Sequence, residues 1–162
     1  MSSATPVHLG FLVFPGFPMA VLTSALEPLR AAHENAGKPA FSWTVIGEEE
    51  GAINASANVV FQPDLILDEA EALDFIFLLS SPQGAFLKPR KGNGRLRHLG
   101  RHGSAIGAVS GGIFPLAASG LMEDRLTLTH WCYKAAFQTE FPNLECSDDV
   151  LVIDRGRYTA SG

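Results

Sequence analysis

Cysteine is scarce in this chain of 162 residues, and the two that occur form no metal motif. Cys132 and Cys146 make no CxxC pair and no cluster with histidine at metal-ligand spacing, so structural zinc is not expected. A single disulfide between the two thiols remains open. The residues predict neither a metal nor another cofactor.

The N-terminal region lacks a long hydrophobic run and an early positive charge. The first basic residue is Arg30, and Pro15, Gly16 and Pro18 interrupt the apolar stretch of residues 9–22. A signal peptide needs a positive start and an unbroken apolar run, and a membrane span needs about 20 such residues. We therefore expect a cytoplasmic protein without a membrane partner.

Positive charge is in the minority. The 12 lysines and arginines against 17 acids give a net charge of −5, which argues against this chain alone gripping a phosphate backbone. Half of the basic residues lie in residues 88–101, without an acid or an interleaved aromatic residue. We interpret this stretch as a solvated loop and helix face, with a nucleic-acid patch as the alternative. Glu48, Glu49 and Glu50 are interpreted as a solvated turn rather than a metal site.

Disorder and fibrous architectures are excluded by a composition of 46% hydrophobic and 18% charged residues. The length favours one domain. Short apolar runs predict strands at residues 8–14, 41–47, 74–79, 104–109 and 126–129, one or two more within 53–61, and a hairpin at 150–154 and 157–160. Helical spacing predicts helices at residues 18–35, 113–119 and 131–141. This alternation predicts an α/β fold with a mostly parallel sheet.

Polar and small residues follow the predicted strands, where open α/β sheets bind ligands. These residues are Pro15, Ser80, Ser81, Ser110 and His130. The sharpest pattern is Ala-Val-Ser-Gly-Gly at residues 108–112, which fits an A-x-S-x-G version of the nucleophile elbow. A sharp turn there would push the Ser110 hydroxyl into a pocket, and only small neighbours would leave room for it.

Simpler interpretations of the same residues remain open. Ser110 is also a preferred helix N-cap residue, so Gly111 and Gly112 could merely begin the next helix. His130 could be structural, with Thr129 capping its helix. Glu27, which precedes Pro28 in the first helix, could be an exposed helix residue.

Four motifs in order give the chain a family resemblance. They are LVFPGF at residues 12–17, ALEPLR at 25–30, AVSGGIF at 108–114 and LTHW at 128–131. Together they resemble the class I glutamine amidotransferase-like domain, a branch of the ThiJ/PfpI superfamily found at the N-terminus of AraC-type transcriptional regulators. The resemblance covers nearly the whole chain.

The resemblance implies a three-layer flavodoxin-like sandwich, usually dimeric. It implies a pocket built from Glu27, Ser110 and His130, to which we add a set of neighbours as candidate ligand-binding residues: Gly111, Trp131, Pro15, Ser80 and Ser81. Trp131 could offer an aromatic face to a cation. Residues 1–162 would then form a sensing domain that stops before its last helix, with a helix-turn-helix DNA-binding region downstream.

Three departures from the family pattern bear on activity. Catalytic members have a Cys where this chain has Ser110, and protease-like members have a His where it has Gly111. Many members carry a Gly pair where it has Ser80 and Ser81. A hydroxyl needs a well-placed base before it can attack, whereas a thiol is readily tuned to a thiolate.

The expected function is therefore a non-catalytic ligand-sensing and dimerisation domain of a bacterial regulator. The resemblance suggests small nitrogenous metabolites, such as amino acids or quaternary amines, as ligands. One alternative is a small serine hydrolase or amidase that uses Ser110 as nucleophile, His130 as base and Glu27 as orienting acid. Another is a purely structural dimerisation module.

Overall fold

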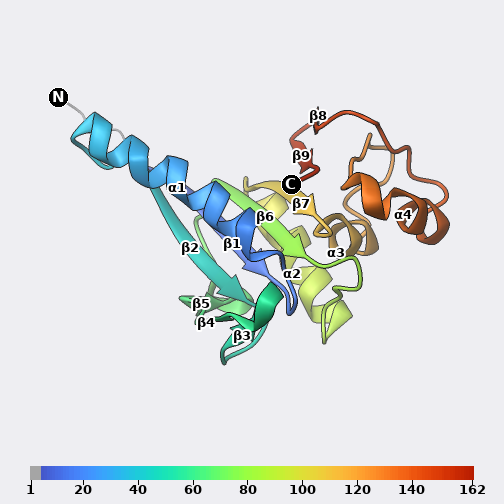
Figure 1. The fold of residues 1–162 in the computed structure, drawn as a ribbon, viewed down its shortest axis with the longest axis horizontal. Helices are drawn as coiled ribbons and strands as arrows, with labels where there is room; N and C mark the ends of the chain where they lie inside the picture. The colour runs from blue at the N-terminus through green and yellow to red at the C-terminus, as the bar shows by residue number, and fades with distance from the viewer. Residues whose placement is uncertain (1–4) are drawn as a thin grey trace.

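A seven-stranded sheet forms the centre of the computed structural model, which describes residues 5–162 (Figure 1). The strand order is β5-β2-β1-β6-β7-β9-β8, and all neighbouring pairs are parallel except β8 with β9. The strands are β1 (Val7–Val13), β2 (Phe41–Gly47), β5 (Leu65–Ile66), β6 (Phe75–Ser80), β7 (Ala105–Ser110), β8 (Leu151–Asp154) and β9 (Arg157–Ala160). The predicted α/β fold with a mostly parallel sheet is confirmed.

The short apolar runs became the central strands because both of their faces are covered. Leu12 of β1 lies opposite Ile46 of β2 on one side and Leu78 of β6 on the other. All three side chains are 0% exposed. Nearly continuous apolar sequence is what strands buried on both faces require.

Within the described residues, four α-helices accompany the sheet: α1 (Met19–Ala36), α2 (Pro89–Arg101), α3 (Ile113–Ala118) and α4 (Lys134–Glu140). As predicted, α1 ends at Gly37, whose left-handed φ of +62° closes the helix. The helix continues through Pro28 as one element. At its start, the backbone N–H of Met19 donates to Oγ of Ser56 at 3.0 Å, so a distant loop caps it.

The structure differs from the predictions in three places. Residues 126–129 form no strand, because only Thr127 makes a bridge, with Cys146. The edge strand β5 was not predicted, whereas the one or two strands expected within residues 53–61 are present as a separate two-stranded ribbon, β3 (Ile53–Asn54) and β4 (Val60–Phe61), around the turn η1 (Ser56–Asn58). The predicted helix 131–141 begins as a 3₁₀ turn, η3 (Trp131–Tyr133).

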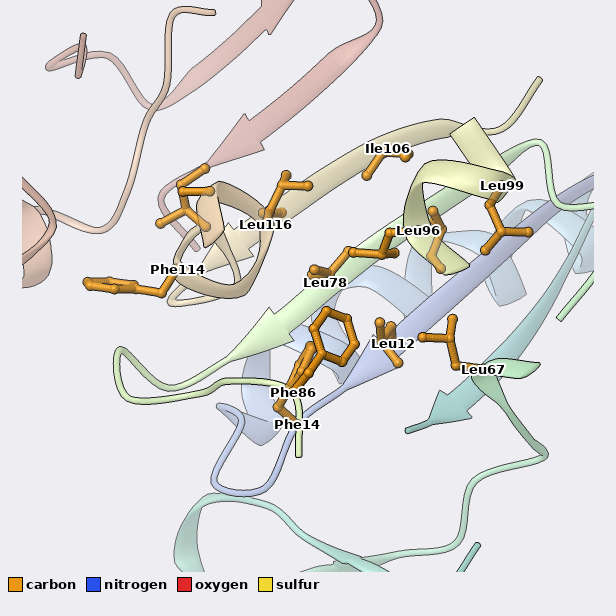
Figure 2. Packing of buried hydrophobic residues seen from close by; sticks show 14 of the residues in the cluster. Leu12, Phe14, Leu67, Leu78, Phe86, Leu96, Leu99, Ile106, Phe114 and Leu116 are labelled. Atoms are coloured by element: carbon orange, nitrogen blue, oxygen red, sulfur yellow. The ribbon is translucent and has the colours of Figure 1, made fainter. Parts of the chain in front are cut away.

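Two hydrophobic clusters lie on opposite faces of the sheet. The larger joins the strands to α2, α3 and the 3₁₀ turn η2 (Leu67–Glu69). Figure 2 shows this cluster, with Leu12 and Leu78 beside Leu96 of α2, and Phe14 against Phe86 at a ring distance of 5.0 Å. The smaller cluster joins α1 to β1, β2 and β6. The helices on both faces confirm the three-layer sandwich.

The α1 face of the sheet is only partly covered. Figure 1 shows α1 crossing β1 and β2, whereas β7 and β9 lie beyond it. Strand register aligns Phe77, Gly107, Tyr158 and Ile153 in one row across β6, β7, β9 and β8. Phe77 and Tyr158 are half-buried, and Ile153 is 60% exposed. The part of this face formed by β6, β7, β9 and β8 is therefore an apolar surface that no helix of the described residues covers.

Candidate functional site

The candidate site begins at the sharp turn that ends β7. Ser110 has a φ of +56°, a left-handed conformation that costs a non-glycine residue about 1–2 kcal/mol. The residue is 4% exposed. The N-cap of α3 is Gly112, not Ser110, and no side chain caps that helix. The turn therefore has the strained backbone predicted for an elbow, and the interpretation of Ser110 as a helix cap is wrong.

Two glycines allow the elbow to press against the end of β6. A Cβ atom on Gly111 would lie 2.7 Å from the backbone nitrogen of Pro82, and one on Gly112 would lie 2.6 Å from the carbonyl carbon of Leu78. Both distances are below the 3.0 Å that real Cβ atoms keep. Small neighbours are thus required at both positions, as the motif predicted.

The two serines at the end of β6 differ in whether the hydroxyl is buried and hydrogen-bonded within the fold. Ser80 is 0% exposed, and its Oγ donates to the carbonyl oxygen of Ser81 at 2.8 Å. Ser81 is half-buried, and its Oγ lies 3.7 Å from the position of a Cβ on Gly16, in the loop after β1. Of the two predicted residues, Ser81 lies beside the loop after β1, whereas the hydroxyl of Ser80 is buried and already hydrogen-bonded to the backbone.

His130 lies near the elbow, but its ring is held by the backbone. A Cβ on Gly162 would lie 3.7 Å from Cβ of Ser110 and 3.9 Å from Cδ2 of His130, so both residues flank this glycine. Nδ1 of His130 accepts the N–H of Cys132 at 3.2 Å, and His130 rather than Thr129 is the N-cap of η3. A neutral ring that accepts at Nδ1 carries its proton on Nε2. Nε2 is then a donor and not a base.

Glu27 does not reach the elbow. Its carboxylate pairs with the guanidinium of Arg30 at 2.9 Å, and its side chain is 64% exposed. This pairing raises the pKa of Arg30. The α1 residue beside Gly162 is Val21, whose Cγ2 lies 3.9 Å from the position of a Cβ there. At about 100° per residue, Glu27 is about 120° around the helix from Val21. The prediction that Glu27 shares a pocket with Ser110 and His130 is wrong.

Trp131 and the cysteines make no enclosed site. Trp131 is 78% exposed, with its ring 5.5 Å from that of His130. Cys132 and Cys146 are both free thiols, so the disulfide left open by the sequence is not formed. Within residues 5–162, no cluster of three or more His, Cys, Asp or Glu residues could hold a metal ion.

Among the cavities that the described residues form at the carboxyl edge of the sheet, two lie beside predicted site residues. One, of about 280 Å³, lies between α1 and Val109 and is lined by Ala20, Val21, Ser24, Ala25, Val109 and Gly162. The other, of about 290 Å³, lies where the loops after β1, β2 and β6 meet, and Pro15 contributes to its wall. The first cavity borders the elbow, and its lining contains no ionisable side chain.

The basic stretch 88–101 became α2 and the loop before it, and several of its cations are engaged within the domain. Lys88 pairs with Glu49, and Lys91 pairs with Asp68. The guanidinium of Arg95 donates to the carbonyl oxygen of Ala70 at 2.6 Å. These contacts agree with a solvated helix face.

The chain is similar in sequence to curated HTH-type transcriptional regulators. No protein-family model matches the chain. It is 32% identical over 157 residues to the HTH-type transcriptional regulator GbdR of Pseudomonas aeruginosa, covering 97% of this chain and 43% of that protein. It is 30% identical to the HTH-type transcriptional regulator GlxA of Rhizobium meliloti, covering 96% of this chain and 48% of that protein. The chain thus spans just under half the length of the curated relatives it matches.

No helix among the described residues is long and apolar enough to span a membrane.

The solved structures share the fold. An AraC family transcriptional regulator from Pseudomonas putida superposes with a TM-score of 0.84 at 20% identity, over 97% of this chain and 84% of that one. A ThiJ/PfpI family protein from Pseudomonas syringae superposes with a TM-score of 0.74 at 17% identity, over 98% of this chain and 63% of that one. The chain therefore has the fold of ThiJ/PfpI family proteins, and its sequence is similar to part of HTH-type transcriptional regulators.

Proposed function

We propose that this chain is the ligand-sensing and dimerisation domain of a bacterial AraC-type regulator, and that it has no catalytic turnover. One observation carries the proposal: the elbow is present, but its catalytic partners are not in place. Ser110 keeps the strained turn, whereas the residue that α1 brings to it is the apolar Val21. The small nitrogenous metabolite suggested by the resemblance is the proposed ligand.

The serine hydrolase is the second candidate, because Ser110 and His130 do flank the same glycine. Two features speak against it. The Nδ1 of His130 accepts a backbone N–H, which leaves the protonated Nε2 for any contact with a hydroxyl. Glu27, the proposed orienting acid, is exposed and paired with Arg30. A hydroxyl without a base is a poor nucleophile.

The uncovered half of the α1 face supports the placement of this domain within a longer regulator. The match covers 84% of the solved Pseudomonas putida chain, so about a sixth of that chain has no counterpart here. Gly162 lies beside Val21 at the edge of this face. We propose that a helix following residue 162 covers Phe77, Tyr158 and Ile153, and that the DNA-binding region lies beyond it.

Regulation would work by a shift between dimer arrangements. A metabolite that binds one arrangement more tightly biases the spacing of the attached DNA-binding regions. A tenfold preference corresponds to about 1.4 kcal/mol, which is enough to change the populations of two nearly equal states.

A thermal-shift screen of the purified chain tests this proposal. The compounds are amino acids, betaines, polyamines and simple carboxylates, and a ligand that binds only the folded state raises the Tm. In parallel, turnover of a generic ester and amide is compared between wild type and Ser110→Ala. We expect a ligand and no turnover. Turnover that disappears in Ser110→Ala would establish the hydrolase, and a screen with neither result would leave a structural module.

A further inference from the structure

The cavity between the loops after β1, β2 and β6 lies at the topological switch point of the sheet. β1 is flanked by β2 on one side and β6 on the other. The helix after β1, α1, packs on one face, whereas α2, which follows β6, packs on the opposite face. The two connections leave in opposite directions, which opens a crevice at the carboxyl ends of the strands, the usual ligand position in open α/β sheets.

Apolar side chains form much of the wall of this cavity of about 290 Å³. Its lining includes Val13, Phe14, Pro15, Ile53, Ala85 and Leu87. Leu87 is 71% exposed, so its side chain is open to contact with a ligand in the cavity. The wall therefore offers apolar contact area to a molecule with aliphatic groups.

The charge in this cavity is of one sign. Glu48, Glu49 and Glu50 line it, and its lining contains no lysine, arginine or histidine. The carboxylate of Glu48 accepts the N–H groups of Leu87 and Lys88 at 2.7 and 2.8 Å, so it holds the β6–α2 loop. Glu49 pairs with Lys88. Glu50 has no hydrogen-bond or ion-pair partner among the described residues, so its charge is available to a ligand.

The loops around the cavity are tied to one another. The N–H of Gly16 donates to the carbonyl oxygen of Asn54 at 2.7 Å, which joins the loop after β1 to β3. Glu48 joins the loop after β2 to the loop after β6. The walls are thus formed before a ligand arrives, as is usual for small-molecule sites.

We propose that this cavity, rather than the elbow, binds the ligand of the sensor, and that the ligand is an organic cation. Its aliphatic part would contact Leu87, Ala85 and Ile53, and its ammonium or guanidinium group would be balanced by Glu50. The inference rests on the proposed sensing function and adds to it the charge and place of the ligand. Glu50 also borders a more polar hollow that contains Gln62, Pro63 and Asp64, which offers less apolar surface.

Calorimetric titration of the chain with paired probes tests the inference. Choline and agmatine are the cations, and 3,3-dimethylbutan-1-ol is the uncharged counterpart of choline. We expect a cation to bind and the alcohol to fail. Glu50→Gln should weaken cation binding about fivefold, and Glu140→Gln, on an exposed turn of α4, should leave it unchanged. Binding should also weaken as salt is raised.

Bulky variants locate the site. Ala85→Trp, on the cavity wall, should abolish binding, whereas Gln62→Trp in the neighbouring hollow and Ser110→Phe at the elbow should preserve it. Circular dichroism and Tm confirm that each variant is folded. Binding lost in Ser110→Phe but kept in Ala85→Trp would overturn the inference and leave the sensing function intact, as would binding lost only in Gln62→Trp.

The probes also separate the two proposals. If no cation binds but another compound of the thermal-shift screen raises the Tm, the inference about charge is overturned and the sensor stands. If nothing in either experiment binds, both fall.

Discussion

Replacing Gly112 by alanine should destabilise the domain strongly, because the added methyl group has nowhere to go. Its Cβ would lie 2.6 Å from the carbonyl carbon of Leu78 and closer still to the oxygen. Leu78 belongs to β6, a central strand paired on both sides, so neither backbone can move alone. Relief requires β6 and the elbow to separate by several tenths of an ångström. Overpacking of this kind costs about 3 kcal/mol.

Gly94→Ala is the matched control. Gly94 lies inside α2, where an added Cβ meets no atom within 4 Å, so alanine should stabilise the helix by about 0.5–1 kcal/mol. In a chain of this length, 1 kcal/mol shifts the Tm by about 2–4 °C. Thermal denaturation should therefore show a loss of roughly 6–12 °C for Gly112→Ala and a gain of a few degrees for Gly94→Ala. Equal Tm values for the two variants would refute the packing described for the elbow.

Three further changes test other parts of the structure. Burial, and then the neighbouring His102, lower the pKa of His98, so the fold favours its neutral form. The contribution of His98 to the free energy of unfolding should therefore be complete above about pH 6.5 and be lost below it. The decrease in Tm at acid pH should be smaller in His98→Gln. Glu27→Ala should leave ligand binding unchanged in titrations, because this carboxylate pairs with Arg30; lost binding would restore it to the site. Ile153→Lys should hardly change the free energy of unfolding of this chain, but if a helix covers β8 in a longer chain it should lower that chain's free energy of unfolding by about 1.5–3 kcal/mol, measured by denaturant unfolding.

Local sequence predicted the parts of the fold that local chemistry determines. The apolar run before Ser80 became β6, and Gly37 ended α1 through its left-handed backbone. Ser110 could be identified as an elbow because the turn needs small residues after it. Residues 126–129 alternate like a strand, yet in the fold β7 pairs with β9, and residues 126–129 contribute only the bridge between Thr127 and Cys146.

The errors at the site have different causes. The position of Glu27 was open to calculation, because the angle between residues 21 and 27 on a helix places them on different faces. The role of Glu48 was not, because its carboxylate accepts N–H groups 39 and 40 residues further along the chain. Contacts of that separation depend on the assembled sheet, so the same three glutamates looked like a solvated turn in the sequence and became one wall of a cavity in the structure.

The strain at Ser110 does not by itself argue for catalysis. A left-handed residue at this position costs about 1–2 kcal/mol, and that cost is expected at functional turns. Here the same turn also has a structural role. It sends the chain from β7 directly into α3, whose residues Ile113, Phe114 and Leu116 belong to the larger core cluster. Burying even one such side chain contributes about 1.5–3 kcal/mol, which offsets the strain. The elbow can therefore persist without a nucleophile, and the site of ligand binding is free to lie elsewhere on the same edge of the sheet.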